Sequence, residues 1–254
     1  MQNTVLITGA SSGLGEEFAI QLAAQGANLL LVARRHEKLQ LLQKQLAEKY
    51  PQQSFSILPL DLNQENASEL VATFIETENI QLLGLINNAG FGARGRFDEQ
   101  STIRQREMLQ VNIVALTMLT YKMLENLKRT PDSFIINVAS TAAFQAGPNL
   151  ALYYASKAFV LSFSEALYEE LHGQISVSAL CPGATKTEFA EVANMSSSLA
   201  FKLRVTEKQP VVASALMNRH KAIVIPGIIN KIAVMAVKLL PRSISRKLAY
   251  QVQK

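Results

Sequence analysis

The sequence predicts an α/β protein, a doubly wound parallel sheet of about seven strands held between two layers of helices. Short apolar runs rich in β-branched residues alternate with longer helical patterns along most of the chain. A glycine-rich turn joins the first apolar run directly to the first helical pattern. Polar or glycine-containing loops follow several of the runs, and parallel pairing would place these loops together at one edge of the sheet.

The amino-terminal half is expected to contribute four buried strands. The first of them, Thr-Val-Leu-Ile-Thr, is a short apolar run with β-branched residues, which is typical of a strand covered on both faces. The four runs occupy residues 4–8, 28–33, 54–60 and 82–86. The helical patterns between them occupy residues 13–26, 37–49 and 66–77. Connections of this length predict right-handed strand–helix–strand units.

The carboxyl-terminal half continues this alternation. A long apolar helical pattern covers residues 108–128, and a second helix is expected to begin near Tyr153. The remaining strands are expected at residues 134–138, 175–181 and 222–225. A further helical pattern over residues 207–219 precedes the last strand and completes the layers.

The turn after the first strand carries the first functional signal. It reads Thr-Gly-Ala-Ser-Ser-Gly-Leu-Gly over residues 8–15, between a strand and a helix. Glycines let the backbone approach a pyrophosphate closely, and the helix N-terminus offers free N–H groups and a partial positive charge. This context favours a dinucleotide cofactor. The alternative is an ordinary strand-to-helix turn in which glycine serves only tightness.

The end of the second strand indicates which dinucleotide would bind. About 20 residues beyond a glycine turn of this kind, an Asp or Glu would bind the ribose 2′-hydroxyl of NAD. This chain has Ala33 and Arg34 there, followed by Arg35. Arginine matches a 2′-phosphate in charge and geometry, so NADP(H) is favoured over NAD(H). An arginine pair on a solvated helix cap is the competing interpretation.

The segment from Ser140 to Lys157 carries the candidate chemistry. Tyr153 and Lys157 are four residues apart, so on a helix they lie on one face. A nearby ammonium favours the phenolate, and we expect it to lower the pKa of Tyr153 toward proton exchange with a carbonyl or an alcohol. Ser140 follows a strand, and its hydroxyl could donate to the substrate oxygen. Tyr-x-x-x-Lys is also a common accident on amphipathic helices, and Tyr154 is a rival for the same role.

Composition limits the other classes of function. The 254 residues are 48% hydrophobic and 18% charged, which is typical of a globular chain. Residues 208–254 hold nine Lys/Arg and no Asp/Glu, whereas the first 207 residues hold 16 basic and 20 acidic residues. The net charge of +5 therefore belongs to the end of the chain, which argues against nucleic acid as a partner of the main body.

Cysteine, histidine and hydropathy patterns add three expectations. The single cysteine, Cys181, fits a core position and a reducing compartment. The scattered histidines, His36, His172 and His220, lack the spacing of metal ligands, so no metal site is expected. We see no signal peptide and no apolar run of the roughly 18 residues that a membrane span needs. A cytoplasmic location is therefore expected.

Further short motifs complete an ordered set along the chain. The set comprises residues 8–15, Asp61-Leu62, Asn87-Asn88-Ala89-Gly90, Asn112, Ser140, Tyr153 with Lys157, and Pro182-Gly183. The gaps are 28 residues from Asn112 to Ser140 and 13 from Ser140 to Tyr153. In motifs, order and gaps, the chain resembles the short-chain dehydrogenase/reductase family, which has a Rossmann-type fold. The resemblance extends to about residue 226.

The resemblance implies a role for each of these positions. Tyr153 would be the general acid/base, and Ser140 would orient the substrate oxygen, so both would contact the substrate. Asn112 would hold a water that relays protons to Lys157, which would also bind the nicotinamide ribose. Arg34 would bind the 2′-phosphate. The other implied cofactor contacts are Gly9, Ser11, Ser12, Gly13, Leu14, Gly15, Asp61, Leu62, Asn88, Ala89, Gly90, Tyr153, Pro182, Gly183 and Thr185.

The segment over residues 186–220 is expected to cover the substrate. Its apolar side chains, joined by Phe91 and Phe144, suggest an aliphatic, steroid-like or acyl ketone rather than a sugar. The residues concerned are Ala190, Ala193, Met195, Leu199, Phe201 and Leu203. The alternative is that they pack in the core or in a subunit contact.

Residues 1–226 are expected to form a single catalytic domain, and residues 227–254 a basic amphipathic helical tail. Helical patterns cover residues 228–240 and 242–252. Lys231 and Lys238 lie on one face of the first pattern, and Ile244, Leu248 and Val252 lie together on the second. Such helices can lie on an anionic membrane surface, cover a neighbouring subunit or close the substrate mouth. Peripheral membrane contact is not the favoured hypothesis of the three.

The sequence thus predicts an NADP(H)-dependent oxidoreductase that interconverts a carbonyl and a secondary alcohol on a hydrophobic small molecule. One alternative is an NAD-linked alcohol dehydrogenase of the same family. Another is a non-catalytic nucleotide-sensing or scaffolding protein that keeps the fold. The complete Ser/Tyr/Lys/Asn set argues against this last alternative, because a binding module does not need a proton path. The family resemblance also implies a homodimer or homotetramer.

Overall fold

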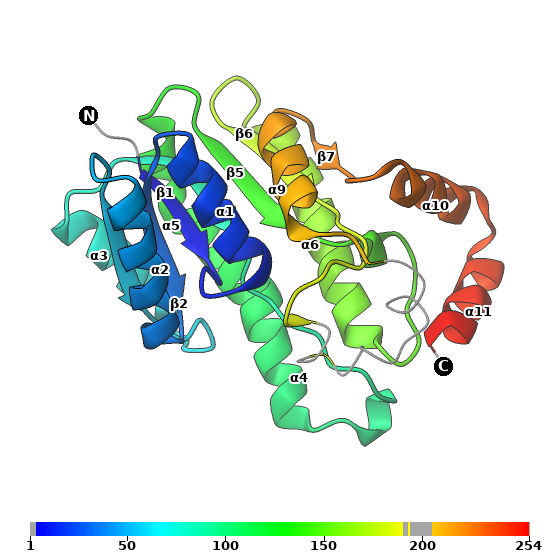
Figure 1. The fold of residues 1–254 in the computed structure, drawn as a ribbon. Coiled ribbons are helices and arrows are strands. Elements are labelled where there is room, and N and C mark those ends of the chain that lie inside the picture. Colours follow the sequence, from blue (N-terminus) through cyan, green and yellow to red (C-terminus); the bar gives the residue numbers. More distant parts are fainter. Residues whose placement is uncertain (1–3, 190–192, 194–204, 254) are drawn as a thin grey trace.

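The computed structural model describes residues 4–189, 193 and 205–253 (Figure 1). Seven parallel strands form one sheet in the order β3-β2-β1-β4-β5-β6-β7, so the predicted doubly wound sheet is confirmed. The strands are β1 (Thr4–Thr8), β2 (Asn28–Ala33), β3 (Phe55–Pro59), β4 (Leu82–Asn87), β5 (Phe134–Val138), β6 (Ser176–Leu180) and β7 (Ile223–Val224).

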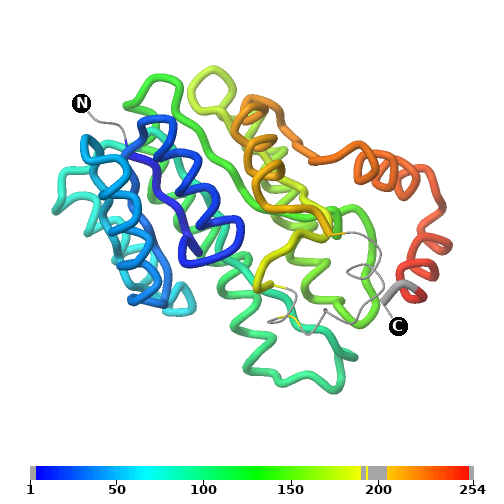
Figure 2. Tube along the Cα trace, viewed as in Figure 1, coloured from blue at the N-terminus to red at the C-terminus, as the bar shows by residue number. Residues whose placement is uncertain are grey.

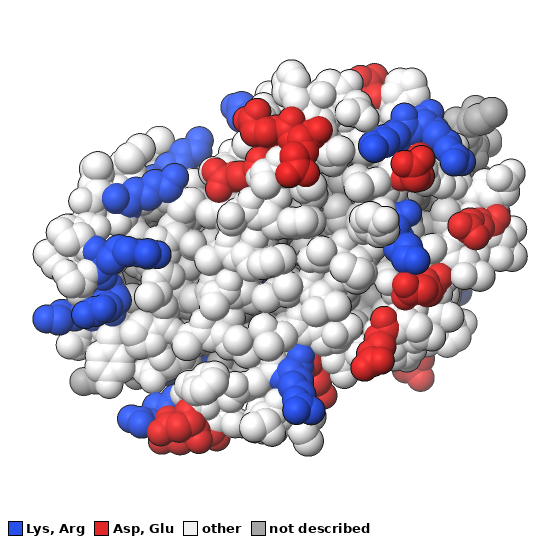
Figure 3. Space-filling view, turned by 180° about the vertical axis from the view of Figure 1, so that it is seen from behind, with Lys and Arg blue, Asp and Glu red and all other residues white. Residues whose placement is uncertain are grey.

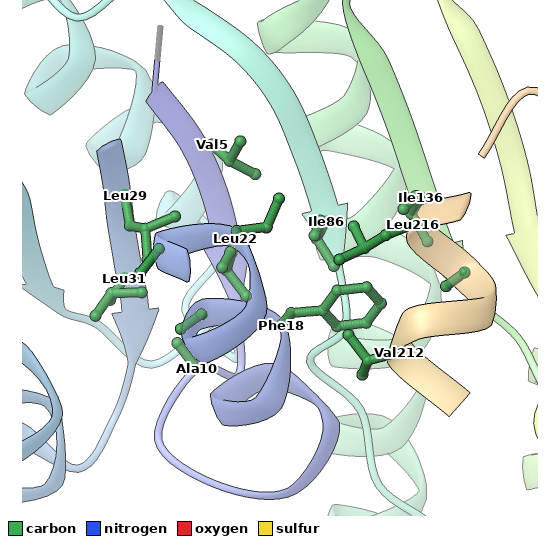
Figure 4. Close-up of a cluster of buried hydrophobic side chains, with 14 of the residues drawn as sticks. Val5, Ala10, Phe18, Leu22, Leu29, Leu31, Ile86, Ile136, Val212 and Leu216 are labelled. Carbon is green, nitrogen blue, oxygen red and sulfur yellow. The ribbon is translucent and has the colours of Figure 1, made fainter. Parts of the chain in front are cut away.

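Helices cover both faces of this sheet, which confirms the three-layer arrangement. The first face is covered by α1 (Gly13–Ala24), α2 (His36–Lys49) and α9 (Lys208–Met217), and the second by α3 (Ala67–Thr77), α5 (Leu116–Lys128) and α6 (Ala151–Glu170). Successive strand residues point to opposite faces, so Val5 and Ile7 pack with the first group and Leu6 packs with the second. Figure 4 shows Phe18 of α1 beside Ile86 and Val212 in the first of these cores.

The sheet order reverses between β1 and β4. The chain runs outward from β1 to β3, then crosses back to β4 and continues to β7. Loops on the two sides of this point therefore diverge, and in open parallel sheets the crevice that they leave is the usual ligand site. The glycine turn follows β1, and the segment that begins at Asn88 follows β4, so both border this crevice.

The expected helix over residues 108–128 begins earlier and is not uniform. The structure has α4 (Thr102–Leu109), a π-helical turn η2 (Gln110–Ala115) and then α5. Asn112 lies inside the π-turn. Apolar periodicity over a window of this length does not reveal a widened turn.

Two helices follow β7 and form an arm at one end of the molecule (Figure 2). They are α10 (Ile228–Leu239) and α11 (Arg242–Gln253), close to the predicted bounds. Leu240 between them has extended backbone angles, which is expected for a residue that precedes proline, here Pro241. Among the described residues, no helix combines the length and the apolar character that crossing a membrane requires.

Candidate active site

A cavity of about 480 Å³ lies at the carboxyl ends of the strands and brings together most of the residues singled out from the sequence. The lining includes Gly9, Ser11, Ser12, Gly13, Leu14, Arg34, Asp61, Leu62, Asn88, Ala89, Gly90, Ser140, Tyr153, Lys157, Pro182, Gly183 and Thr185. Gly15 and Asn112 are not part of the lining. Both residues instead contact residues that line the cavity.

The glycine turn has the shape that close backbone packing requires. Gly9 and Gly13 have φ angles of +65° and +60°, in the left-handed region that favours glycine. A Cβ on Gly15 would overlap the carbonyl oxygen of Gly9, so only glycine fits this first helical turn. Asn88 holds the turn from the side, because its Nδ2 donates to the carbonyl oxygens of Thr8 at 2.9 Å and Gly9 at 3.2 Å.

The first turn of α1 offers backbone N–H groups that can bind an anion. Ser12 precedes the helix, but its side chain makes no capping hydrogen bond to the N–H groups of the first turn. Its hydroxyl instead accepts a hydrogen bond of 2.6 Å from Arg35. The first N–H groups of a helix have no intrahelical partners, and here they lie at the cavity between glycines. These residues fit the pyrophosphate of a dinucleotide.

Two arginines follow β2, and they have different partners. Arg34 is 65% exposed, and its Nη1 lies 4.0 Å from a carboxylate oxygen of Asp61. Arg35 turns toward the glycine turn and donates to the hydroxyls of Ser11 at 3.2 Å and Ser12 at 2.6 Å. The sequence pattern indicates Arg34 alone for the 2′-phosphate. The adjacent Arg35 was the available signal, but its direction depends on the fold.

Arg34, Arg35 and Lys38 form a basic corner beside the glycine turn, and Glu188 pairs with two of them. No pattern in the sequence indicates Glu188. Its carboxylate accepts from Arg35 at 2.7 Å and from Lys38 at 2.6 Å, across about 150 residues of chain. These two cations lower the pKa of Glu188 to about 2. The acidic side chain therefore stays ionised beside the cations that a phosphate would need. A pairing over such a sequence distance has no local pattern.

Tyr153 and Lys157 extend from the first turns of α6 into the cavity, and both are buried. The Tyr153 hydroxyl is hydrogen-bonded to the side chain of Ser140. The Ser140 Oγ also accepts from the N–H of Ala142 at 3.1 Å, which leaves the Ser140 proton available for donation. The ring of Tyr154 packs against Gly147 instead. The geometry thus supports Tyr153 over its neighbour as the reacting phenol.

Burial controls the two titrating groups. It raises the pKa of Tyr153, and the hydrogen bond from Ser140 only partly opposes this effect. Burial also lowers the pKa of Lys157 to about 8. Lys157 donates to the carbonyl oxygen of Val138 at 2.7 Å, and its Nζ lies 6.0 Å from the Tyr153 ring centre. The expected lowering of the Tyr153 pKa by Lys157 is therefore wrong, because desolvation has the largest effect on the phenol and the Lys157 ammonium is directed to the carbonyl oxygen of Val138.

We predict that Lys157→Met raises the stability of the cofactor-free protein at neutral pH. Burial in the folded protein lowers the pKa of Lys157 from 10.5 to about 8. Keeping the Lys157 ammonium charged therefore costs the folded state about 3 kcal/mol at pH 7. The substitution also removes the hydrogen bond to Val138, which stabilises the folded state by about 1 kcal/mol. The variant should therefore be about 2 kcal/mol more stable than the unsubstituted protein. Denaturant unfolding followed by circular dichroism measures the difference.

The pH dependence separates this effect from simple repacking. Between about pH 8 and pH 10.5 the unfolded chain binds more protons at Lys157 than the folded chain does. The stability of the unsubstituted protein should therefore rise through this window and approach that of Lys157→Met. A difference that stays constant with pH would contradict the prediction.

Asn112 acts one layer below the cavity. Its Nδ2 donates to the carbonyl oxygen of Phe91 and to the hydroxyl of Ser156, both at 3.0 Å. Its Oδ1 accepts from the N–H of Phe91, also at 3.0 Å. Both amide hydrogens are thus committed to protein partners, and the side chain fixes the Phe91 segment against α6. A role for Asn112 in proton supply stays a prediction.

Part of the cavity lining is apolar. Phe91 and Phe144 line it as expected, and Val234 and Val237 of α10 join them. Ala193 of the expected cover is buried, and its carbonyl oxygen accepts from the N–H of Arg94 at 3.0 Å. The rest of that expectation, Ala190, Met195, Leu199, Phe201 and Leu203, lies outside the described residues. Helix α10 is thus a wall of the cavity, and covering the substrate mouth was one of the three placements that the sequence left open for the tail.

The fold and this edge of the sheet define a Rossmann-type protein with the features of a dinucleotide site. Its sequence matches the family model described as short chain dehydrogenase over residues 3–197. The chain therefore belongs to the short-chain dehydrogenase/reductase family, as the motif resemblance implied. Relatives in this family are named dehydrogenases and reductases.

Individual relatives agree with this assignment. A protein named 11-beta-hydroxysteroid dehydrogenase from Pinus massoniana is 36% identical over 184 residues, which are 70% of this chain and 50% of that protein. The chain thus spans half the length of this curated relative. The structure of a short-chain dehydrogenase from Sphingobium yanoikuyae in complex with NADPH has a TM-score of 0.81 at 29% identity, covering 95% of this chain and 97% of that one.

A third relative is named for the other nicotinamide cofactor. The structure of 3-ketoacyl-(acyl-carrier-protein) reductase from Brucella melitensis complexed with NADH has a TM-score of 0.75 at 25% identity. The alignment covers 88% of this chain and 96% of that one. Between them, these two solved relatives are described with NADPH and with NADH.

Proposed function

We propose that this protein is an NADP(H)-dependent oxidoreductase that interconverts a hydrophobic ketone and the corresponding secondary alcohol. The observation that carries the proposal is the hydrogen-bonded pair of Tyr153 and Ser140, with Lys157 beside it, in a cavity that continues to the glycine turn. A protein that only bound a nucleotide would not need a buried phenol and a buried lysine in the lining of such a cavity. Burying them costs free energy.

In the proposed reaction, a bound nicotinamide would supply or accept the hydride. Tyr153 donates its proton to the carbonyl oxygen as the hydride reaches the carbonyl carbon, which yields the alcohol. Ser140 donates a hydrogen bond to the same oxygen, where negative charge develops. Lys157 then resupplies the proton to Tyr153. In oxidation, the same groups move the proton in the opposite direction.

The buried phenol favours the reductive direction. A general acid must carry its proton before the reaction, and a phenol whose pKa is not lowered below its ordinary value is protonated at neutral pH. Lys157 has a pKa of about 8, so it can exchange a proton near neutral pH. A protonated phenol beside a lysine that can exchange its proton suits the direction in which a proton goes to the carbonyl oxygen.

The basic corner beside the glycine turn supports NADP(H) over NAD(H). Arg34, Arg35 and Lys38 lie at the cavity or next to it, and hydroxyls of Ser11 and Ser12 face Arg35. A 2′-phosphate would accept charge-assisted hydrogen bonds from such groups. An NAD-linked dehydrogenase is the alternative. Glu188 already neutralises part of this positive charge, and a less basic site would suit the ribose 2′-hydroxyl of NAD(H).

The apolar residues in the cavity lining support a hydrophobic substrate. Phe91, Phe144, Val234 and Val237 offer no hydrogen bonds from their side chains, which suits an aliphatic, acyl or steroid-like ketone better than a sugar. The relatives named above are described as acting on a hydroxysteroid and on a 3-ketoacyl group, which agrees with this class.

The test is an absorbance assay of NADPH and NADH oxidation with a panel of steroid, acyl and cyclic aliphatic ketones. We expect turnover of at least one hydrophobic ketone, with NADPH as the better cofactor. Tight binding of either nucleotide without turnover of any ketone or alcohol would support the non-catalytic alternative instead.

We further propose that the protein forms a homodimer or homotetramer through α5 and α6. Met118 and Tyr121 of α5 are 42% and 70% exposed, and Phe159 of α6 is 39% exposed. Figure 3 views the molecule from this side and shows a broad area without charged side chains. Large apolar side chains exposed on a side with a broad uncharged area are typical of a subunit contact.

For this contact we predict that Tyr121→Glu shifts an oligomer toward the monomer of 27.9 kDa. Two buried carboxylates at a symmetric interface would face each other without a partner. Size-exclusion chromatography with light scattering measures the mass. Leu41→Glu is the matched control, because Leu41 is 59% exposed on α2, on the other face of the sheet. A Tyr121→Glu protein with unchanged mass would rule out this contact.

Two further expectations stay proposals. We propose that residues 1–226 act as one catalytic domain, although α10 contributes Val234 and Val237 to its cavity. We also propose a cytoplasmic location, for which the buried free thiol of Cys181 is compatible support.

A further inference from the structure

The outer face of α10 carries a stripe of large apolar side chains. Ile228, Ile232, Met235 and Leu239 follow each other at intervals of four, three and four residues, so they lie on one side of the helix. Their exposed fractions are 71%, 63%, 59% and 79%. We refer to these four residues as the α10 stripe.

The α10 stripe is not the face that packs on the protein. The opposite side of the helix carries Ala233, Val234 and Val237, which line the cavity, and Val234 is only 5% exposed. A surface helix normally presents polar residues outward. Because α10 is apolar on both sides, we expect both sides to be shielded from water. The inner side packs on the protein, and the outer side needs a partner other than the described residues.

Helix α11 also exposes large apolar side chains. Ile244 and Leu248 are 46% and 53% exposed, while Ser245 and Ala249 are buried on the other side of the helix. The exposed apolar residues of α10 and α11 therefore belong to one arm of the molecule, at the end beyond β7 (Figure 2).

The charge of this arm selects its partner. Residues 227–254 contain six Lys/Arg and no Asp/Glu. In Figure 3 basic side chains gather along the left edge of the molecule, where α10 and α11 lie. Two copies of the chain that met through this arm would bring two sets of cations together without counter-charges. An anionic surface with an apolar interior complements both features.

We propose that α10 and α11 bind the surface of an anionic lipid bilayer, with the α10 stripe inserted among the lipid chains. Each helix has 12 residues, so they lie along the surface and do not cross it. Because the inner side of α10 lines the cavity, the same helix separates the cavity from the lipid. The lipid contact itself does not depend on the proposed reaction, and lipid binding can be tested without any substrate.

The test is co-sedimentation of the full chain with vesicles of phosphatidylcholine alone or mixed with phosphatidylglycerol. We expect binding to the mixed vesicles and much weaker binding to phosphatidylcholine alone. Ile232→Glu/Leu239→Glu should lower the partition coefficient by about tenfold or more, because two apolar side chains no longer insert. Lys231→Glu/Arg246→Glu should lower it by at least about fivefold for each cation removed, and high salt should have a similar effect.

Met217→Glu is the matched control, because Met217 is 72% exposed on α9 and lies outside the arm. It should bind vesicles like the unsubstituted protein, and thermal unfolding by circular dichroism should show that all variants fold. Equal binding by the control and the stripe variant would overturn the proposal, as would binding independent of anionic lipid. A stripe variant that lowers the oligomer mass, in a protein that does not bind vesicles, would show that a second copy covers this face.

Discussion

Tyr153→Phe is expected to lower kcat by about 10²–10⁴ and to leave cofactor binding nearly unchanged. The substitution removes one oxygen atom and its proton and keeps the ring in its place on α6. Loss of the hydrogen bond to Ser140 has a small structural effect, because the Ser140 hydroxyl keeps its bond from the N–H of Ala142. The proton donor is lost while the glycine turn and the cavity wall remain. Steady-state kinetics and NADPH fluorescence titration measure the two quantities.

Tyr154→Phe is the matched control for this prediction. Tyr154 is the next residue on the same helix and also lines the cavity, but its ring packs against Gly147. We expect its effect on kcat to be within about tenfold. If the two variants lost activity equally, or if Tyr154→Phe lost more, the assignment of the general acid would be wrong. If Tyr153→Phe lost NADPH binding to the same extent as turnover, a structural role would explain the result.

The double variant Arg34→Asp/Arg35→Asp is expected to lower the preference for NADPH over NADH by about 10²-fold or more. Each charge-assisted hydrogen bond to a phosphate contributes about 1.5–3 kcal/mol, and the new carboxylates would also repel the 2′-phosphate. Binding of NADH should change much less, because an acidic residue at this place can accept a hydrogen bond from the ribose hydroxyl. The ratio of kcat/KM for the two cofactors is the measurement.

The single variants and Glu188→Gln locate the effect. Arg35 has the hydroxyls of Ser11 and Ser12 as partners, so Arg35→Asp should account for more of the change than Arg34→Asp. Glu188 competes with a phosphate for Arg35 and Lys38, so Glu188→Gln should tighten NADPH binding. Lys44→Asp on the exposed side of α2 is the control for a general change of charge, since Lys44 pairs only at 3.9 Å with Glu48. A preference that stays the same in the double variant would place the selectivity elsewhere.

Local patterns carried most of the fold. The alternation of apolar runs and helical patterns predicted every strand of the sheet within about two residues at each end, because buried strands and amphipathic helices are visible in short windows. The glycine turn and the Tyr–Lys pair were visible for the same reason. Each of these motifs lies within a few consecutive residues. Parallel topology then brings the carboxyl ends of the strands together at one edge of the sheet.

Contacts between distant parts of the chain were not visible in this way. The ion pairs of Glu188 join it to residues about 150 positions away, and the amide of Asn112 is committed to Phe91 and Ser156. The expectation for the pKa of Tyr153 used the distance along a helix and could not include desolvation. Burial is a property of the whole packed molecule, so its effect on the pKa appears only with the tertiary structure.

The sequence by itself determined the α/β class, the order of the elements and the residues that gather at the carboxyl edge of the sheet. These depend on periodicity and on short motifs, which operate over a few residues. The tertiary structure decided that Arg35 faces the glycine turn, that Tyr153 is held protonated and that α10 forms a wall of the cavity with an apolar outer face. The physical reason is that direction, burial and exposure result from packing between segments that no local pattern connects.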